Sequence, residues 1–397
     1  MNNEKYPQRI DYGVILSVML LAIISIVSIY STTVLIQDGG VGMTVRQVMW
    51  YGLGALAVLI VMQFDSEQLW KMTSYLYVLG IILLIMTLLF YDRPLAARTG
   101  GKSWIRLGPL GTIQPSEFGK ISLILMLAKV VTKHNSYYRQ RDYQNDFLLL
   151  GKLALVSIVP LVLVFMQNDL GTALVYIAIA VGVILLSGVK WQILLPIFLV
   201  ITIIGATLIL LVVFRRDLLY QTGLFAPYQF ARIDTWLFPH SGRSDANYQI
   251  TQTLKAIGTG GVFGKGFGVS DVYVPVRESD MIFATIGENF GFAGGAFLIF
   301  IYFVLVYQMI KVVYDTKNEF YAYIATGVIM MIVFHVFENI GMNIGLLPIT
   351  GIPLPFVSQG GSSLLGNMMG IGLIMSMRYH HKSYFFSGEG EEFHPGS

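Results

Sequence analysis

The chain of 397 residues has no cysteine and few charged residues. The absence of cysteine excludes disulfide bonds, thiolate zinc sites and a cysteine nucleophile. Charged residues make up 12% of the chain, about half of the roughly 25% that is typical of soluble proteins. Lysine and arginine number 26 against 23 aspartates and glutamates, which gives a net charge of +3. A charge so near neutral argues against a nucleic-acid binder, because such a protein needs a basic face to neutralise phosphates.

Long apolar runs take the place of the missing charges, and 55% of the residues are hydrophobic. A transmembrane helix needs about 20 mostly apolar residues to cross roughly 30 Å of hydrocarbon. The sequence therefore predicts an all-α, polytopic membrane protein with about ten transmembrane helices. The ten predicted spans are residues 12–37, 47–64, 72–91, 117–132, 148–167, 170–189, 191–214, 289–310, 320–337 and 360–377.

The distribution of positive charge orients these spans in the membrane. An even number of spans places both termini on the same side. With the amino terminus inside, the inner segments carry eleven lysines and arginines, whereas the short outer loops after the fifth and ninth spans carry none. We therefore expect both termini in the cytoplasm, a single transmembrane domain over residues 1–386, and a disordered acidic tail over residues 387–397.

Two outer segments depart from this charge pattern. The loop near residues 92–116 is basic and includes Lys102 and Arg106. The segment near residues 215–280 is too long for the charge rule to apply, and loops of such length are commonly functional. Within it, residues 246–257 carry apolar side chains at helical spacing, which predicts a short amphipathic helix on the outer membrane surface.

The glycine-rich run at residues 258–268 looks at first like a phosphate-binding loop. It does not fit that motif, because no glycine stands five residues before Gly264 and because Lys265 is followed by glycine rather than serine or threonine. The predicted orientation also places it outside the cell, away from ATP. The sequence contains neither an HExxH zinc motif nor a Gly-x-Ser-x-Gly nucleophile elbow.

Ionisable residues inside the predicted spans are informative, because a charge in the bilayer is unfavourable and usually faces a bundle interior or a water-filled cavity. Glu117 and Lys120 are spaced i, i+3, so they share one face at the outer start of the fourth span. This pair belongs either to a functional site or to a structural helix entry. The ninth span carries a polar stripe in its outer half, for which we favour a cavity lining over contacts between helices. The stripe consists of His335, Glu338, Asn339 and Asn343.

Two further carboxylates lie near the start of the eighth span. Asp280 stands where the long outer segment meets the span, and Glu288 lies eight residues further on, about 12 Å along a helix. Structural roles are open for both: a helix cap for Asp280 and an interhelical hydrogen bond for Glu288. Asp169 is expected to cap the sixth span, and residues 358–363 form a Gly/Ser turn whose backbone N–H groups suit an anion. Together these groups predict a cavity on the outer half of the bundle for an anionic, lipid-linked substrate.

The chain resembles the SEDS family (shape, elongation, division and sporulation), which includes RodA, FtsW and SpoVE, in a series of motifs and in the order in which they follow one another. The resemblance covers nearly the whole chain and is closer to RodA than to FtsW. It departs from the family pattern at Asn168, where proline is usual, and at residues 277–280, where Glu-x-His-Thr-Asp is the commoner form. The motifs are Lys102-Ser-Trp-Ile-Arg106, Gln114-Pro-Ser-Glu-Phe-Gly-Lys120, Asp169-Leu-Gly-Thr172, Tyr248-Gln249, Gly264-Lys-Gly-Phe-Gly268, Glu278-Ser-Asp-Met-Ile-Phe283 and Pro353-Leu-Pro-Phe-Val-Ser-Gln-Gly-Gly-Ser362.

The resemblance implies a peptidoglycan glycosyltransferase that polymerises lipid II at the outer face of the bacterial cytoplasmic membrane and releases undecaprenyl diphosphate. It implies a RodA-like role in cell-wall elongation and cell shape. It also implies as partners a class B penicillin-binding protein, which is a transpeptidase, and other membrane proteins of the elongation complex. The family's essential outer-loop aspartate corresponds to Asp280, and its conserved glutamate and lysine correspond to Glu117 and Lys120.

Asp280 is accordingly the candidate general base, or else the ligand of a divalent cation, Mg or Mn, on the diphosphate. The open alternatives are a lipid II flippase or other transporter, a scaffold that recruits a synthase, and a division-specific, FtsW-like role. Ionisable groups that crowd one side of the membrane, rather than form a path through it, favour the enzyme over the transporter. The candidate substrate-binding residues are Lys102, Trp104, Arg106, Arg277, Glu288, His335, Glu338, Asn339, Asn343, Ser358, Gln359 and Ser362.

Overall fold

The computed structural model describes residues 10–35, 40–106, 108, 111–138, 142–215, 233–237 and 245–380. The predicted tail at residues 387–397 lies outside the described residues. Of the predicted long outer loop, residues 216–232 and 238–244 also lie outside them, whereas residues 245–280 are described.

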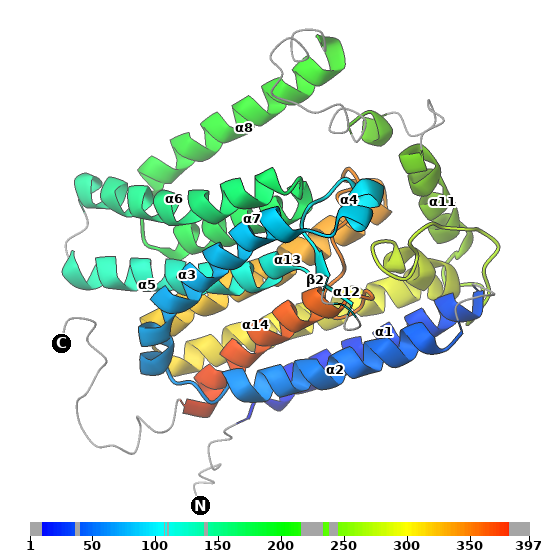
Figure 1. Cartoon of the computed structure of the whole chain (residues 1–397), viewed down its shortest axis with the longest axis horizontal. Helices are drawn as coiled ribbons and strands as arrows, with labels where there is room; N and C mark the ends of the chain where they lie inside the picture. The colour runs from blue at the N-terminus through cyan, green and yellow to red at the C-terminus, as the bar shows by residue number, and fades with distance from the viewer. Residues whose placement is uncertain are drawn as a thin grey trace, which may run out of the picture.

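Ten long helices make up the membrane-spanning part of the described residues (Figure 1). Each of the ten predicted spans falls on one of them, and the prediction of an all-α, polytopic membrane protein is confirmed. Seven helices are long and apolar enough to cross a membrane, and α7 is apolar but shorter. The ten are α1 (Tyr12–Leu35), α2 (Gly42–Val61), α3 (Ser66–Phe90), α5 (Pro115–Tyr137), α6 (Tyr143–Met166), α7 (Leu170–Leu186), α8 (Trp191–Phe214), α12 (Ile282–Thr316), α13 (Glu319–Asn343) and α14 (Gly361–His380).

The helices differ in how much of their surface the protein covers. The central helix α5 packs against α3, α6, α7, α13 and α14, and it buries Glu117, Lys120 and His134 with most of its apolar side chains. The helix α8 lies at the edge of the bundle (Figure 1), and only 6% of its most apolar stretch is buried in the protein. This division follows from the membrane, because charged groups need partners inside the protein whereas an entirely apolar helix is stable against lipid.

A small cap between α3 and α5 covers part of the outer end of the bundle. It consists of the short helix α4 (Arg93–Thr99) and the antiparallel strands β1 (Ile105–Arg106) and β2 (Thr112–Ile113). One oxygen of Asp92 accepts the Leu95 N–H and starts α4, and the other accepts the Nε–H of Arg106 at 2.6 Å. Although burial opposes ionisation, the Leu95 N–H and the Arg106 guanidinium hold the pKa of Asp92 below its usual value. These contacts tie β1 to α4.

The predicted amphipathic helix is present as α11 (Asp245–Thr259). Its buried residues include Ile250 and Ala256, and Ala256 packs in a cluster with Met281 and Met342 beside α12 and α13. The expectation that the apolar face rests on the membrane surface is therefore wrong, because the outer ends of α12 and α13 cover that face instead.

The helix α12 is broken at Gly291, which has φ 64° and ψ −160°. Such a break frees backbone groups, and inside a membrane each unsatisfied group is strongly unfavourable. Residues 260–266, here called the glycine loop, run beside the break and supply the missing partners. The backbone hydrogen bonds run from Lys265 N–H to Glu288 C=O (2.9 Å), from Gly266 N–H to Asn289 C=O (3.1 Å), from Phe292 N–H to Gly261 C=O (2.9 Å) and from Ala293 N–H to Val262 C=O (2.9 Å).

The glycine loop needs glycine because its backbone lies directly against α12. A Cβ on Gly260 would lie 1.9 Å from the carbonyl oxygen of Gly287, and one on Gly264 would lie 2.1 Å from that of Asn289. Gly264 also has a φ of +80°, which side-chain-bearing residues rarely adopt. The glycines that resemble a phosphate loop in the sequence therefore serve to repair the break in α12.

We predict that Gly264→Ala destabilises the protein by at least about 2 kcal/mol, because it combines a strained backbone with a clash against Asn289. Gly258→Ala is the control, since this exposed glycine lies in α11 with no atom within 4 Å of the added Cβ, and its effect is expected to stay within about 1 kcal/mol. Unfolding of the detergent-solubilised protein measures both variants. Equal stability of the two variants would contradict the role given to the glycine loop.

Candidate functional site

A cavity of about 700 Å³ opens among the outer ends of α5, α7, α12, α13 and α14. Glu117 lines it from the first turn of α5, Asp169 from the start of α7, Asp280 from the segment before α12, and His335 from α13. These four residues are more than 40 positions apart in the sequence at every step, so only the fold brings them together. Other residues that line the cavity include Trp104, Gln114, Thr172, Thr350 and Gln359.

Behind this wall lies a buried polar triad. The Lys120 ammonium is 2.7 Å from Oε2 of Glu117 and 3.1 Å from Nε2 of His335, and the Lys120 side chain is 1% exposed. The Nδ1 atom of His335 lies 2.6 Å from the carbonyl oxygen of Met331. Since a carbonyl only accepts, Nδ1 carries the proton, and Nε2 accepts a hydrogen bond from Lys120. His335 is therefore neutral, and the charge of Lys120 is balanced by Glu117.

The cavity wall at the start of α7 is fixed by polar contacts between helix ends. The Gln114 side chain donates to Oδ2 of Asp169 at 2.8 Å, and Oδ1 of Asp169 accepts the Thr172 N–H at 3.0 Å. Asp169 thus caps α7, as its position in the sequence predicts. The hydroxyl of Ser362 accepts the Gln114 N–H at 3.0 Å, which joins the start of α14 to the same wall.

Asp280 is half-buried at the cavity. A Cβ on Gly351 would lie 3.4 Å from its Oδ2, so its carboxylate faces the wall formed by residues 350–353. The backbone carbonyl of Asp280 accepts one hydrogen bond from Asn339 (2.8 Å) and another from Asn343 (3.1 Å). Two side-chain amides of α13 therefore fix the residue that we expect to do chemistry.

The two residues before Asp280 are held in the same way. The Ser358 hydroxyl donates to the Ser279 carbonyl at 2.6 Å, and the Gln359 N–H donates to the Glu278 carbonyl at 3.0 Å. Ser358 also accepts the Leu354 N–H at 2.8 Å. Together with the amides on Asp280, these bonds satisfy three consecutive carbonyls and fix residues 278–280 as a rigid strap along the cavity.

The structure divides the predicted site residues into three groups. Five line the cavity: Trp104, Glu117, Asp280, His335 and Gln359. Five support it from behind without lining it: Lys120, Asn339, Asn343, Ser358 and Ser362. The remaining predicted residues lie outside the cavity wall: Lys102, Arg106, Arg277, Glu288 and Glu338.

The third group lies away from the cavity lining, and the structure shows what surrounds each of its residues. The Lys102 ammonium lies 5.6 Å from the centre of the Tyr91 ring, and Arg106 pairs with Asp92 in the cap. Arg277 and Glu288 pair with each other, and Glu338 is buried, with 4% of the residue exposed. Lys102, Arg106 and Arg277 thus each lie against a protein group that the linear sequence does not reveal.

Sequence reasoning assigned no site role to Gln114, Asp169 and Thr172, all of which line the cavity. The sequence predicts Asp169 only as a helix cap, and a residue that caps a helix is not by itself expected to line a site as well. One feature of the sequence does point to them: Gln114 directly precedes the helix that carries Glu117, and Asp169 directly precedes another helix that starts at the same membrane face.

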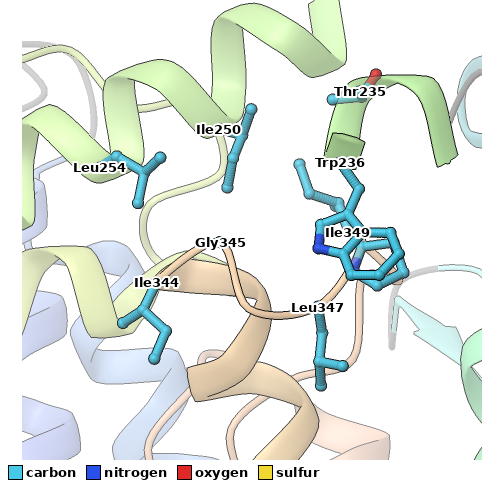
Figure 2. Close-up of a pocket in the computed structure, with 9 residues that line it drawn as sticks. Thr235, Trp236, Ile250, Leu254, Ile344, Gly345, Leu347 and Ile349 are labelled. Carbon is cyan, nitrogen blue, oxygen red and sulfur yellow. The ribbon is translucent and has the colours of Figure 1, made fainter. Parts of the chain in front are cut away.

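A smaller hollow of about 140 Å³ lies between α11 and the segment that follows α13 (Figure 2). Trp236, Ile250, Leu254 and Leu347 are among its apolar lining residues, and none of the residues that line it is titratable. The candidate chemistry therefore belongs to the larger cavity.

The fold and the cavity together define a polytopic membrane protein with a polar site at the outer face. Residues 12–383 match the model of the FtsW, RodA and SpoVE family, described as cell cycle proteins. The chain belongs to this family.

Relatives are found in several branches of the family. The chain is 30% identical over 375 residues to "Stage V sporulation protein E" of Bacillus subtilis, which covers 92% of this chain and 96% of the relative. It is 32% identical over 388 residues to "Peptidoglycan glycosyltransferase MrdB" of Escherichia coli K12, with 96% and 97% covered. It is 30% identical over 384 residues to "Probable peptidoglycan glycosyltransferase FtsW" of Hydrogenovibrio crunogenus, with 94% and 92% covered. Because these three identities differ by only two percentage points, they do not assign the chain to one branch of the family.

Two solved structures have the same fold. RodA of Thermus thermophilus matches with a TM-score of 0.66 and 24% identity, over 94% of this chain and 97% of that chain. A second structure concerns structural coordination of polymerization and crosslinking by a peptidoglycan synthase complex. One of its chains matches with a TM-score of 0.76 and 24% identity, over 95% of this chain and 99% of that chain.

We predict that Lys120→Met lowers the free energy of unfolding by about 3–5 kcal/mol, because it leaves the buried Glu117 carboxylate without its countercharge. The control is Lys71→Met, which removes an exposed pair with Glu67 at the same short range, 2.5 Å, and is expected to change stability by no more than about 0.5 kcal/mol. Unfolding in mixed detergent measures both. A Lys120→Met variant as stable as the control would show that the buried pair does not contribute to stability.

Proposed function

We propose that this multi-pass protein of the bacterial cytoplasmic membrane is a peptidoglycan glycosyltransferase that polymerises lipid II at the outer face. The observation that carries the proposal is the cavity of about 700 Å³ at the outer ends of the helices, with Asp280 on one wall and the buried Glu117–Lys120 pair on another. Two of the relatives described above are named as peptidoglycan glycosyltransferases, one of them as probable, which supports the same activity here.

The reaction requires a base and a stabilised leaving group. The acceptor's sugar hydroxyl loses its proton as its oxygen bonds to the anomeric carbon of the donor sugar. The bond between that carbon and the diphosphate oxygen breaks, and undecaprenyl diphosphate leaves with the electron pair. A general base must lie within hydrogen-bond reach of the hydroxyl, and groups that favour negative charge must already face the diphosphate.

Asp280 is the carboxylate best suited to act as the base. Glu117 is paired with Lys120, and Asp169 accepts hydrogen bonds from Gln114 and the Thr172 N–H, so both carboxylates have structural work. Asp280 lines the cavity, and its backbone is fixed there by Asn339 and other neighbours. Fixing the backbone holds a reacting group in place without reorganisation, which is the requirement for efficient proton transfer.

Lys120 is a positioning residue in this proposal. It does not line the cavity, but it contacts both Glu117 and His335, which do. Its ammonium is nearly free of water, so its field acts across a low dielectric toward the cavity. We expect this field, partly neutralised by Glu117, to favour the negative charge that develops on the diphosphate.

A divalent cation, Mg or Mn, is compatible with the site only as a companion of the substrate. Among the described residues no group of three His, Asp or Glu side chains is placed to hold a metal. Magnesium commonly binds through one or two carboxylates and substrate phosphates, and Asp280 is one such carboxylate. When bound, the cation would neutralise charge on the diphosphate. Addition of EDTA, then of either metal, tests the requirement.

The finer role that we propose is cell-wall elongation and cell shape, in a complex with a class B penicillin-binding protein and other membrane proteins of the elongation machinery. The form of the motif at residues 277–280 supports a RodA-like role. The likeness to a chain of a peptidoglycan synthase complex that couples polymerization and crosslinking supports a transpeptidase partner.

We predict that the purified full chain, in detergent and without a partner, converts lipid II into glycan chains visible on a gel. Asp280→Asn and Asp280→Ala should each lower this activity at least about a hundredfold, within the range typical for loss of general-base catalysis. Glu67→Gln is the control, because it makes the same change from carboxylate to amide at an exposed position far from the cavity.

Each alternative gives a different result. Polymer formed by Asp280→Asn at the wild-type rate would remove Asp280 from the mechanism. If wild type forms no polymer under any condition but speeds the movement of lipid II across vesicle membranes, the protein is a carrier and the proposed activity is wrong.

A further inference from the structure

We propose that Glu288 is a positioning residue for the glycosyl transfer: its buried carboxylate fastens the loop that leads into α12 and so holds Asp280 at the cavity. This inference rests on the proposed function for the role of Asp280. It gives Arg277 and Glu288 a role other than the substrate binding expected of them, and neither residue lines the cavity.

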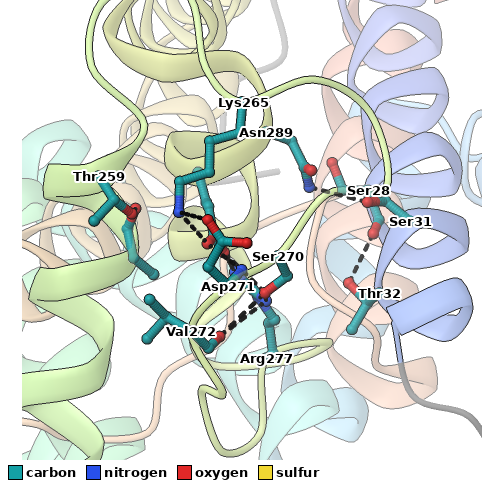
Figure 3. Close-up of polar contacts among 12 residues, drawn as sticks. Ser28, Ser31, Thr32, Thr259, Lys265, Ser270, Asp271, Val272, Arg277 and Asn289 are labelled. Atoms are coloured by element: carbon teal, nitrogen blue, oxygen red, sulfur yellow. Dashed lines mark hydrogen bonds and ion pairs between the residues drawn. The ribbon is translucent and has the colours of Figure 1, made fainter.

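The Glu288 carboxylate binds several groups of the loop that precedes α12. Glu288 is fully buried, and it accepts hydrogen bonds from the Lys265 ammonium (3.1 Å), the Ser270 hydroxyl (3.0 Å) and the Asp271 N–H (3.1 Å). The Arg277 guanidinium completes the set. Figure 3 shows the side chains of Lys265, Ser270, Asp271 and Arg277 close together, with dashed lines for the polar contacts among the residues drawn. One carboxylate therefore binds four positions that span thirteen residues of the loop.

The network is balanced in charge. Lys265 and Arg277 supply two positive charges, and Glu288 and Asp271 supply two negative ones, with Lys265 and Asp271 2.9 Å apart. The hydrogen bond that Lys265 donates to the Asp271 carboxylate raises the pKa of Lys265, which keeps its ammonium charged at neutral pH. Arg277 is 4% exposed and also donates to Ser270 and to the Val272 carbonyl. Loss of the Glu288 charge would leave a buried guanidinium without its counterion, which strongly disfavours this arrangement.

The turn between Arg277 and Asp280 transmits the constraint. Val276 has a φ of +54°, a strained conformation for a β-branched residue that persists only where the surroundings fix it. Its carbonyl accepts the N–H groups of Ser279 (3.2 Å) and Met281 (3.3 Å), so the turn closes around Asp280. One end of this turn is held by Arg277 on Glu288. The other end is held by the bonds to Ser279 and Asp280 described above.

Lys265 joins this network to the glycine loop. Its N–H donates to the Glu288 carbonyl across the break in α12, and its ammonium binds the Glu288 carboxylate. The same residue thus secures both the backbone and the side chain of Glu288. If the Glu288 carboxylate lost its side-chain contacts, the part of the loop that leads to Asp280 would be freed. The backbone contacts between the glycine loop and α12 would remain.

The first test is kinetic and uses Glu288→Gln, Arg277→Gln and the double variant, with Arg277→Lys as the conservative substitution. We expect Glu288→Gln to lower kcat for lipid II polymerisation at least tenfold with KM within twofold of wild type, each kcat being normalised to the fraction of protein that binds lipid II. The double variant leaves no charge unpaired and its two amides can pair, so it should be no worse than the more impaired single variant. Arg277→Lys should retain most of the activity.

Three kinetic results would overturn the proposal. The first is a wild-type kcat in Glu288→Gln, or in Arg277→Gln should Glu288→Gln not fold. The second is a raised KM with unchanged kcat, which is the signature of direct contact with substrate. The third is additive effects of the two single variants, which would mean that the two residues act independently.

The second test does not depend on activity and uses the absence of native cysteine. In Asp280→Cys the new thiol is the only one in the chain, and its rate of labelling by a membrane-impermeant maleimide reports how exposed position 280 is. We expect this rate to rise at least fivefold when Glu288→Gln is added. An unchanged rate overturns the proposal even if wild type polymerises lipid II. A changed rate with no polymer from wild type would refute the proposed function and leave the positioning of residue 280 intact.

Discussion

The repair of the broken helix α12 by the glycine loop is the interaction on which the site depends. A membrane-spanning helix cannot end its hydrogen-bond ladder in lipid without a partner for every freed group. The glycine loop provides those partners at Gly291, and the closeness of its backbone to α12 excludes any side chain at Gly260 and Gly264. This contact brings the outer loop back onto the helix that starts beside Asp280. The backbone contact with α12 therefore helps to fix the loop that leads to Asp280.

The buried charges follow the same rule. Lys120 is neutralised by Glu117, and Arg277 by Glu288, so each buried cation has a carboxylate partner. The first pair stands behind the cavity wall, and the second fastens the loop before α12. Asp280 lies between these two fixed regions, with its backbone held by α13 and by the segment before α14. Rigid supports on both sides suit the proposed reaction, in which a lipid-linked sugar diphosphate and an acceptor must be held in register.

The membrane spans and the Glu117–Lys120 pair could be predicted from the sequence because local spacing determines them. Twenty apolar residues make a span wherever they occur, and an i, i+3 pair shares a helix face regardless of the rest of the fold. The partners of Lys102, Arg106 and Arg277 could not be predicted, because Tyr91, Asp92 and Glu288 meet them only in three dimensions. The purpose of the glycine loop was hidden for the same reason, since nothing local to residues 260–266 indicates a break near residue 291.

The central claim is that glycan is polymerised at the outer face, in the cavity that contains Asp280. The most direct measurement uses vesicles in which every copy of the protein has the same orientation and lipid II is supplied to one leaflet only. The account predicts glycan chains when lipid II is in the leaflet next to the cavity and none when it is confined to the cytoplasmic leaflet. Polymer formed from lipid II in the cytoplasmic leaflet, or lipid II carried across without polymer, would contradict the account.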